Sequence, residues 1–200
     1  MRSISKTINV ALVGVGGQGI LLASEVISRA AMLSGLDVNK SEVHGMAQRG
    51  GSVISEVRFG PKVYSPLIPQ GETDYLISFE LLESLRYADL LAADGEALIN
   101  RQMITPITVS SGQQQPLDDI LGRIDRAFPK KRIIDAMEIA ENLGNIRAAN
   151  IIMTGALAGL LELDETIWVQ AIRELVKPQF VELNIAAFNA GRKLVDTCAV

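Results

Sequence analysis

The sequence predicts an α/β protein with three layers, α/β/α, in which helices cover both faces of a mostly parallel but mixed sheet. Three observations support this fold class. Short apolar segments that read as buried strands alternate with amphipathic helical segments over most of the 200 residues. A glycine-rich turn joins the first strand to the first helix, and the last third of the chain is helical in pattern throughout.

The first strand and helix are the most clearly marked elements. Residues 7–13 are apolar and β-branched and end at a glycine, which is typical of a short buried strand. From Gln18 onward the apolar residues recur at helical spacing, and Gly35 is well placed to end this helix. The apolar face of the helix is expected to hold Leu22, Val26, Ala30 and Leu33.

The middle of the chain predicts several more strands. Residues 37–43 and 52–59 are expected as strands, and 63–68 as the returning half of a hairpin after the turn at 60–62. Further along, we expect a strand at 74–79, a helix at 81–91, a strand at 104–109, a helix at 118–127 and a strand at 132–134. The hairpin would make the sheet mixed.

The C-terminal third predicts three helices. Residues 145–161 are apolar nearly all round, so this helix should be buried on most sides. Asp164 is placed as the N-cap of the next helix, which Pro178 ends and whose inner face is expected to hold Trp168, Ala171, Ile172 and Leu175. A final helix follows from about Phe180. Since no linker or repeat interrupts the pattern, we expect residues 1–200 to form a single domain.

Composition excludes several classes of function. The net charge is −4 and no dense basic stripe exists, so nucleic acid is not an expected partner. One cysteine (Cys198) and one histidine exclude an internal disulfide and an all-cysteine iron–sulfur cluster, and they leave no zinc site. No apolar run reaches the roughly 20 residues of a membrane span. Glycines interrupt the apolar run after the basic start, so we expect no secretory signal and a cytoplasmic protein.

The first motif, residues 14–19 (GVGGQG), matches GxGxxG between a strand and a helix, which gives the chain a Rossmann-like start. Glycines let the backbone approach a phosphate closely, and the N–H groups at a helix start favour an anion. A dinucleotide site also needs an acidic residue at the end of the second strand, and neither Asp37 nor Glu42 fits that place well. A dinucleotide, another phosphate-bearing ligand and a purely structural turn remain alternatives.

The second motif, residues 41–51 (SEVHGMAQRGG), gathers chemistry in one turn-rich loop. Arg49 could clamp a carboxylate or phosphate, and His44 could transfer a proton near neutrality. The alternative is an arginine–glutamate pair that only supports the bend. A third group, residues 145–155, places polar side chains within an apolar helix, and we interpret these as helix packing rather than as a site.

Together the two glycine motifs and the segment Val57-Arg58-Phe59-Gly60 resemble the gamma-type subunit of 2-oxoacid:ferredoxin oxidoreductases. The form His-Gly-Met-Ala-Gln-Arg-Gly-Gly at 44–51 is most similar to the beta subunit of the indolepyruvate enzymes. The resemblance implies an accessory subunit of an enzyme that converts a 2-oxoacid, coenzyme A and oxidised ferredoxin into an acyl-coenzyme A, carbon dioxide and reduced ferredoxin. Indolepyruvate or another arylpyruvate is the expected 2-oxoacid.

The resemblance also implies how the chemistry is divided between subunits. Thiamine diphosphate, magnesium and 4Fe-4S clusters are expected in a larger alpha subunit, and a thiamine motif is absent from this chain. This chain is then expected to have no intrinsic catalytic residue and no metal, to complete the complex and to help bind coenzyme A. The expected coenzyme A contacts are Gly14, Gly16, Gly17, Gln18, Gly19, Arg49, Gly50 and Gly51, and the supporting candidates are Glu42, His44, Gln48 and Arg49.

Two alternative functions remain open from the sequence: a free-standing dinucleotide-dependent oxidoreductase and an assembly domain that binds no ligand. A homodimer is also possible. The chain is rich in aliphatic residues, with 48% hydrophobic but only 4% aromatic residues. Since a subunit that works in a complex should carry an apolar patch for its partner, we expect exposed apolar residues near the 42–51 loop or on the C-terminal helices.

Overall fold

A computed structural model describes residues 4–45 and 51–196. Six strands form one sheet in the order β2-β3-β1-β4-β5-β6. Their bounds are β1 Ile8–Val15, β2 Asp37–His44, β3 Ser52–Gly60, β4 Thr73–Ser78, β5 Leu91–Asn100 and β6 Lys131–Ile134. Neighbours β1, β4, β5 and β6 run parallel, whereas β3 is antiparallel to both β1 and β2, so the sheet is mixed as expected.

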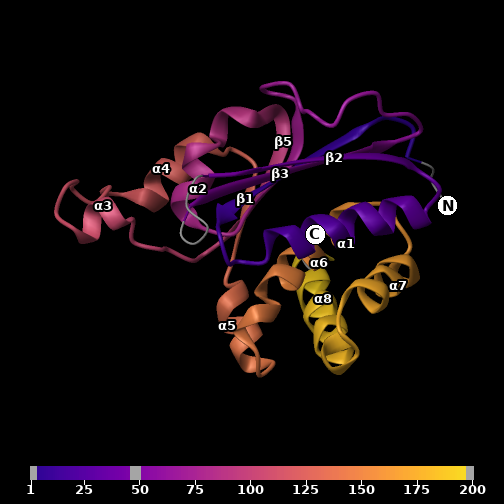
Figure 1. The fold of residues 1–200 in the computed structure, drawn as a ribbon. Helices are drawn as coiled ribbons and strands as arrows, with labels where there is room; N and C mark the ends of the chain where they lie inside the picture. Colours follow the sequence, from indigo (N-terminus) through magenta and orange to yellow (C-terminus); the bar gives the residue numbers. More distant parts are fainter. Residues whose placement is uncertain (1–3, 46–50, 197–200) are drawn as a thin grey trace.

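The helices cover the sheet on both faces, which confirms the three-layer prediction (Figure 1). One face carries α1 (Ile20–Leu33), α5 (Ala136–Asn142), α6 (Ala149–Leu160), α7 (Glu165–Leu175) and α8 (Val181–Asp196). The other face carries α2 (Leu81–Arg86) and α4 (Ile120–Ala127), while the short α3 (Ile107–Ser110) lies in the connection between β5 and α4. Short 3-10 turns occupy η1 (Ala88–Leu90), η2 (Ile146–Ala148) and η3 (Pro178–Phe180).

Strand β1 is buried on both faces. Val10 and Leu12 pack in the core beneath α1, whereas Ala11 and Val13 pack in the smaller core beneath α2 and α4. A strand covered on both sides needs apolar residues at every position, which is why this segment lacks the alternation of an exposed strand. No helix in the described part of the chain is long and apolar enough to cross a bilayer.

The predicted hairpin at 52–68 is wrong. β3 pairs with β2 and β1, and residues 61–72 form an irregular loop with no strand. Prolines at 61, 66 and 69 cannot donate to a strand ladder. Arg58 of β3 instead holds the loop, because its guanidinium donates to the carbonyls of Ser65 (3.1 Å) and Leu67 (2.8 Å).

Strand β5 was missed and the strand expected at 104–109 is wrong. Asp94, Gly95 and Glu96 lie in the middle of β5, so this segment lacks both a continuous apolar run and regular alternation. The predicted helix at 81–91 therefore ends at Arg86, and the chain turns through η1 into this strand. At 104–109 the β-branched residues suggested a strand, but the short helix α3 begins directly after Pro106, whose carbonyl accepts from the N–H groups of Val109 and Ser110 (3.0 Å each).

The C-terminal helices pack tightly, as the apolar pattern predicted. A Cβ at Gly155 of α6 would overlap the carbonyl of Phe188, and one at Gly191 of α8 would overlap the carbonyl of Ile152. The two helices thus approach backbone to backbone. Asp164 caps α7 by accepting from the Thr166 N–H (2.8 Å), which confirms that prediction. Leu175 does not lie on the inner face as expected, because it is the last residue of α7 and is 37% exposed.

Candidate functional site

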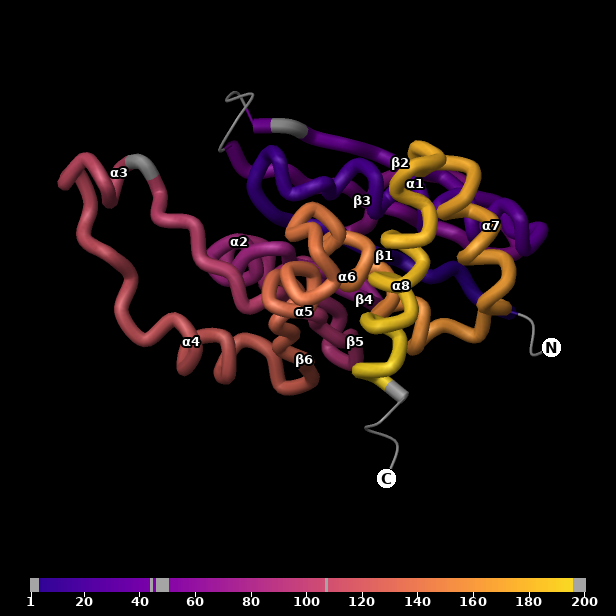
Figure 2. The backbone as a smooth tube through the Cα atoms, turned by 90° about the horizontal axis from the view of Figure 1, so that it is seen from below, coloured from indigo at the N-terminus to yellow at the C-terminus, as the bar shows by residue number. Residues whose placement is uncertain are grey.

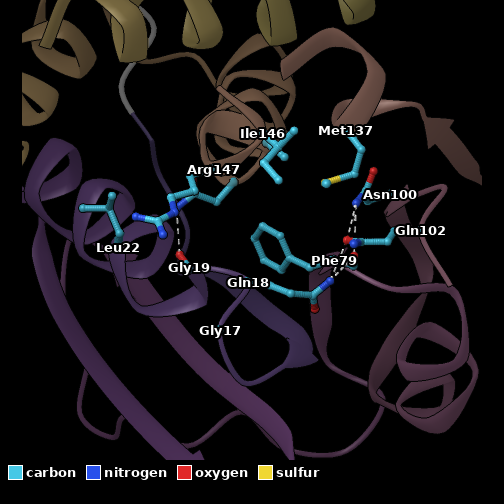
Figure 3. A pocket seen from close by; sticks show the side chains of 12 residues that line it. Gly17, Gln18, Gly19, Leu22, Phe79, Asn100, Gln102, Met137, Ile146 and Arg147 are labelled. Atoms are coloured by element: carbon cyan, nitrogen blue, oxygen red, sulfur yellow. Dashed lines mark hydrogen bonds between the residues drawn. The ribbon is translucent and has the colours of Figure 1, made fainter. Parts of the chain in front are cut away.

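A crevice opens where β1 and β4 end side by side. β1 leads into α1 on one face of the sheet, and β4 leads into α2 on the opposite face. Ligands in α/β proteins bind at such switch points, outside the carboxyl ends of the strands. The cavity here measures about 520 Å³ (Figure 3). It is lined by Gly17, Gln18, Gly19, Leu22, Phe79, Asn100, Gln102, Met137, Ile146, Arg147, Ala149 and Asn150.

Two glycines of the 14–19 turn are required by packing. A Cβ at Gly14 would lie 2.6 Å from Oε1 of Gln18, and a Cβ at Gly19 would overlap the side-chain amide of Asn150. Gly19 also has a φ of 79°, in the left-handed region that favours glycine. Gly17 (φ 105°) differs, since a Cβ there would meet no atom within 4 Å. At Gly17, therefore, the turn leaves open space above the backbone.

The side chain of Gln18 connects the strand ends at the crevice through hydrogen bonds. Its Oε1 accepts from the N–H of Val15 (2.7 Å), and its Nε2 donates to the carbonyl of Phe79 (2.9 Å) and to Oε1 of Gln102 (2.8 Å). Figure 3 shows this side chain lying between the strand ends. Asn100 extends the network, because its Oδ1 accepts from the N–H of Ala136 (3.2 Å) and its Nδ2 donates to Phe79 (3.1 Å). The ends of β1, β4, β5 and β6 are thus connected by side-chain amides.

The crevice is favourable to an anion on the side of α1. No side chain caps the first turn of this helix, so its first N–H groups keep the partial positive charge of a helix start. Arg147 lies on the crevice wall, is exposed, and forms no ion pair within the described residues. Asn150, beside it, is held by the bond from its Nδ2 to the carbonyl of Gly19 (3.0 Å).

The structure separates the candidate residues of the second motif. Glu42 lies on β2, where its carboxylate pairs with Lys40 (2.9 Å) and lies 3.4 Å from Oγ of Ser24, so it serves the α1–β2 contact rather than the crevice. His44 ends β2, opposite Val53 of β3. Gln48, Arg49 and Gly50 lie outside the described residues. The carbonyl of Gly51 accepts from the N–H of Gly16 (2.9 Å), which places the end of this loop against the glycine-rich turn.

Beside the loop, a polar cluster that the sequence did not predict surrounds α2. Ser52 donates to the buried carboxylate of Glu83 and lies 3.0 Å from the Tyr87 hydroxyl, while Arg86 pairs with Glu83 (3.0 Å). Glu80 is buried too and caps α2 by accepting from the Glu83 N–H (2.9 Å). Burial raises the pKa of Glu80 above its usual value, although backbone N–H groups oppose this shift.

The topology argues against a dinucleotide in this crevice. In the dinucleotide-binding arrangement the second strand lies next to the first, so that its acidic residue reaches the ribose. Here β3 intervenes, and at a spacing of about 4.8 Å between neighbouring strands β2 lies roughly 10 Å from β1. In addition, the N–H of Val15 in the turn already donates to the side chain of Gln18 and is not free to bind a phosphate. The motif is present, but two parts of the dinucleotide site are not.

Comparison with known proteins establishes the relationship. A family model with the description "Pyruvate ferredoxin/flavodoxin oxidoreductase" matches residues 9–194. The chain belongs to this family. It is 42% identical over 188 residues to the indolepyruvate oxidoreductase subunit IorB of Archaeoglobus fulgidus, which covers 92% of this chain and 93% of that one.

Solved structures of family members share the fold. The gamma subunit of the keto/oxoacid ferredoxin oxidoreductase from Geobacter sulfurreducens superposes with a TM-score of 0.72 at 22% identity, covering 96% of this chain and 99% of that one. The 2-oxoglutarate:ferredoxin oxidoreductase from Magnetococcus marinus gives 0.76 at 17% identity and covers 98% of this chain but 32% of that longer chain. The same fold thus occurs both as a separate subunit and as part of a larger chain.

Residues that complete the crevice were missed or misread from the sequence. Asn100 and Gln102 follow β5, which was itself missed, so their place at the strand ends was hidden. Arg147 was assigned to helix packing together with Asn150, and only Asn150 has that role. The signal for Arg147 was a charged residue at the start of an otherwise apolar helix. No group of three or more His, Cys, Asp or Glu residues within the described ranges could hold a metal ion.

Proposed function

We propose that the chain is the small, accessory subunit of an indolepyruvate:ferredoxin oxidoreductase. The observation that carries this proposal is the 42% identity to an indolepyruvate oxidoreductase subunit over nearly the full length of both chains. The complex would convert indolepyruvate, coenzyme A and oxidised ferredoxin into indoleacetyl-coenzyme A, carbon dioxide and reduced ferredoxin. The whole chain, 1–200, acts as one domain of this complex, in the cytoplasm, where a single cysteine needs no disulfide partner.

The redox and decarboxylation chemistry belongs to a larger partner subunit. Thiamine diphosphate, magnesium and the 4Fe-4S clusters reside there, and ferredoxin exchanges electrons with the complex through that subunit. A single cysteine is too few for a cluster held by four cysteines. The role of this chain is to complete the complex and to help bind the co-substrate.

The crevice at the end of β1 holds a phosphate-bearing part of coenzyme A. Its volume of about 520 Å³ is in the range of small-molecule sites. The uncapped start of α1 favours a phosphate group, and so does Arg147, which forms no ion pair within the described residues. The wall formed by Leu22, Met137 and Ile146 suits a less polar part of the ligand. Arg49, Gly50 and Gly51 belong to the loop that ends against the same turn, so we include them in this site.

Reconstitution tests the subunit assignment. The larger subunit is purified with and without this chain, and indolepyruvate-dependent reduction of ferredoxin or a viologen dye is measured with coenzyme A present. We expect activity with indolepyruvate that requires both chains, and lower activity with pyruvate and 2-oxoglutarate. Full activity of the larger subunit alone, or a failure of the two chains to co-purify, would contradict the proposal.

Ligand binding to the isolated chain tests the alternative of a free-standing oxidoreductase. Calorimetry with NAD, NADP, FAD and FMN should show no tight binding, since the acidic residue for a ribose is a strand too far away and Gln18 occupies the turn. Tight binding of any of these ligands would favour the alternative instead.

A further inference from the structure

The connection from β5 to α4 projects from the body of the molecule as an arm, defined here as residues 102–117 (Figure 2). From 105 to 117 its described side chains are exposed, apart from the half-buried Val109. The arm nevertheless has a defined shape. The N–H of Gln114 donates to the carbonyl of Thr108 (2.9 Å), and the Thr108 hydroxyl bonds Oε1 of Gln114 (3.0 Å). A long connection of this kind, without a core of its own, usually serves a function.

The composition of the arm is unusual for an exposed segment. Charged residues make up 21% of the chain, yet residues 102–117 contain none, and the nearest charges are Arg101 and Asp118 at its two ends. Met103 and Leu117 are 57% and 41% exposed. The core of a protein interface is depleted of charge in the same way, because a charge without a partner is costly to bury. The arm therefore has the composition of a segment that becomes buried in a complex.

The arm is fixed to the lip of the crevice. The carbonyl of Gln102 accepts from the N–H of Leu81 (2.8 Å), its side chain bonds Gln18, and the N–H of Ile104 donates to the carboxylate of Glu80 (3.0 Å). Other exposed apolar residues belong to the same edge of the sheet. Leu21 lies in the first turn of α1, Val43 is near the end of β2, and Ile146 lines the crevice, with exposed fractions of 43%, 58% and 54%.

We infer that the arm, together with Leu21 and Val43, forms the docking surface for the larger subunit. This inference rests on the proposed function. The occupant is a groove on that subunit with uncharged, apolar walls, which matches the charge-free arm. A second copy of this chain is disfavoured, because coenzyme A in the crevice must reach a reaction centre in the larger subunit. The edge that carries the crevice therefore has to face that subunit.

Hydrogen exchange locates the surface directly. Amide exchange of residues 104–117 is measured in the isolated chain, at two concentrations, and in the assembled complex. We expect slower exchange of the arm in the complex alone, by about tenfold or more. Equal exchange of the arm in both states would overturn the inference. Concentration-dependent protection in the isolated chain would overturn it in favour of a homodimer.

Point variants test the energetic role of the arm without deleting it. Leu117→Glu and Met103→Glu place a charge on exposed arm positions, so both proteins should fold and melt as the parent does. Each should weaken binding to the larger subunit by about tenfold or more, as expected for an apolar anchor at an interface. Leu175→Glu is the matched control, because Leu175 is similarly exposed at the end of α7, in the C-terminal helices.

The outcomes separate this inference from the proposed function. If the parent chain binds and activates the larger subunit but the arm variants bind equally well, the docking surface is wrong and the subunit assignment stands. If the parent chain does not bind the larger subunit at all, the proposed function fails and the docking surface fails with it. If Leu175→Glu weakens binding as much as Leu117→Glu does, the loss of binding is not specific to the arm and the docking surface is wrong.

Discussion

Substitution of Gly19 by alanine should destabilise the protein more than substitution of any exposed glycine in the same turn. Gly19 has a left-handed φ of 79°, which costs a residue with a Cβ about 1–2 kcal/mol. The new methyl would also displace the side-chain amide of Asn150, whose bond to the Gly19 carbonyl contributes about 0.5–1.5 kcal/mol. The sum predicts a loss of about 1.5–3.5 kcal/mol in the free energy of unfolding.

A double-mutant cycle measured by urea unfolding separates these two contributions. In the background of Asn150→Ala the overlap and the hydrogen bond are both gone, so Gly19→Ala should cost only the backbone term of about 1–2 kcal/mol. Gly17→Ala is the control within the turn, since its φ is also positive but no atom lies within 4 Å of the added methyl. If Gly19→Ala costs the same with and without Asn150, the packing explanation of this glycine is refuted.

Three further predictions concern other parts of the molecule. Gly155→Ala in α6 should destabilise the protein by about 2–3 kcal/mol because the added methyl meets the backbone of α8. Gly159→Ala should be close to neutral, because the atoms nearest to its added methyl lie at 3.2 Å. Equal melting temperatures for the two variants would contradict the close contact between α6 and α8. Burial raises the pKa of Glu56 above its ordinary value of 4.5, so its contribution to stability falls as pH rises from about 4.5 through that raised pKa. Glu56→Gln keeps an acceptor for the Ile68 N–H, so this variant should be more stable than the parent at pH 7 and should lose that advantage below pH 4.5. A gain in stability that does not depend on pH would argue against burial as the cause. Gln18→Leu should lower the melting temperature, because it leaves the N–H of Val15 and the carbonyl of Phe79 without their side-chain partner. Gln70→Leu on the surface should leave the melting temperature unchanged, and calorimetric scans of both variants compare the two effects.

The sequence was most informative where local pattern and burial agree. The β1–α1 unit was predicted because its strand is buried on both faces and its turn is marked by glycines whose packing requires them. β5 was missed because Asp94, Gly95 and Glu96 interrupt its apolar pattern, and only residues 95–100 are buried. The partner of β3 was misassigned because strand pairing depends on contacts far along the chain, here with β1, while the residues that follow β3 offered an apparent hairpin.

The candidate site could be predicted only in part. Gly17, Gln18 and Gly19 line the crevice as expected from the motif. Glu42 does not, because Lys40, two residues earlier on the same face of β2, takes its carboxylate. Arg147 reaches the crevice from the turn η2 just before α6, more than a hundred residues from the glycine-rich turn, and only the tertiary fold brings them together. The expected apolar exposure occurs at Val43 beside the 42–51 loop and at Leu175, Phe180 and Leu194 on the C-terminal helices.

The most direct test of the proposed coenzyme A site is the dependence of the assembled enzyme on coenzyme A. Arg147→Ala is compared with the parent and with Lys177→Ala, a cation outside the crevice lining. Loss of a charge-assisted contact to phosphate should raise the KM for coenzyme A about tenfold and leave the KM for indolepyruvate unchanged. Arg49→Ala should act in the same direction. An unchanged KM for coenzyme A in both arginine variants, in a complex that assembles normally, would contradict the binding of coenzyme A at this crevice.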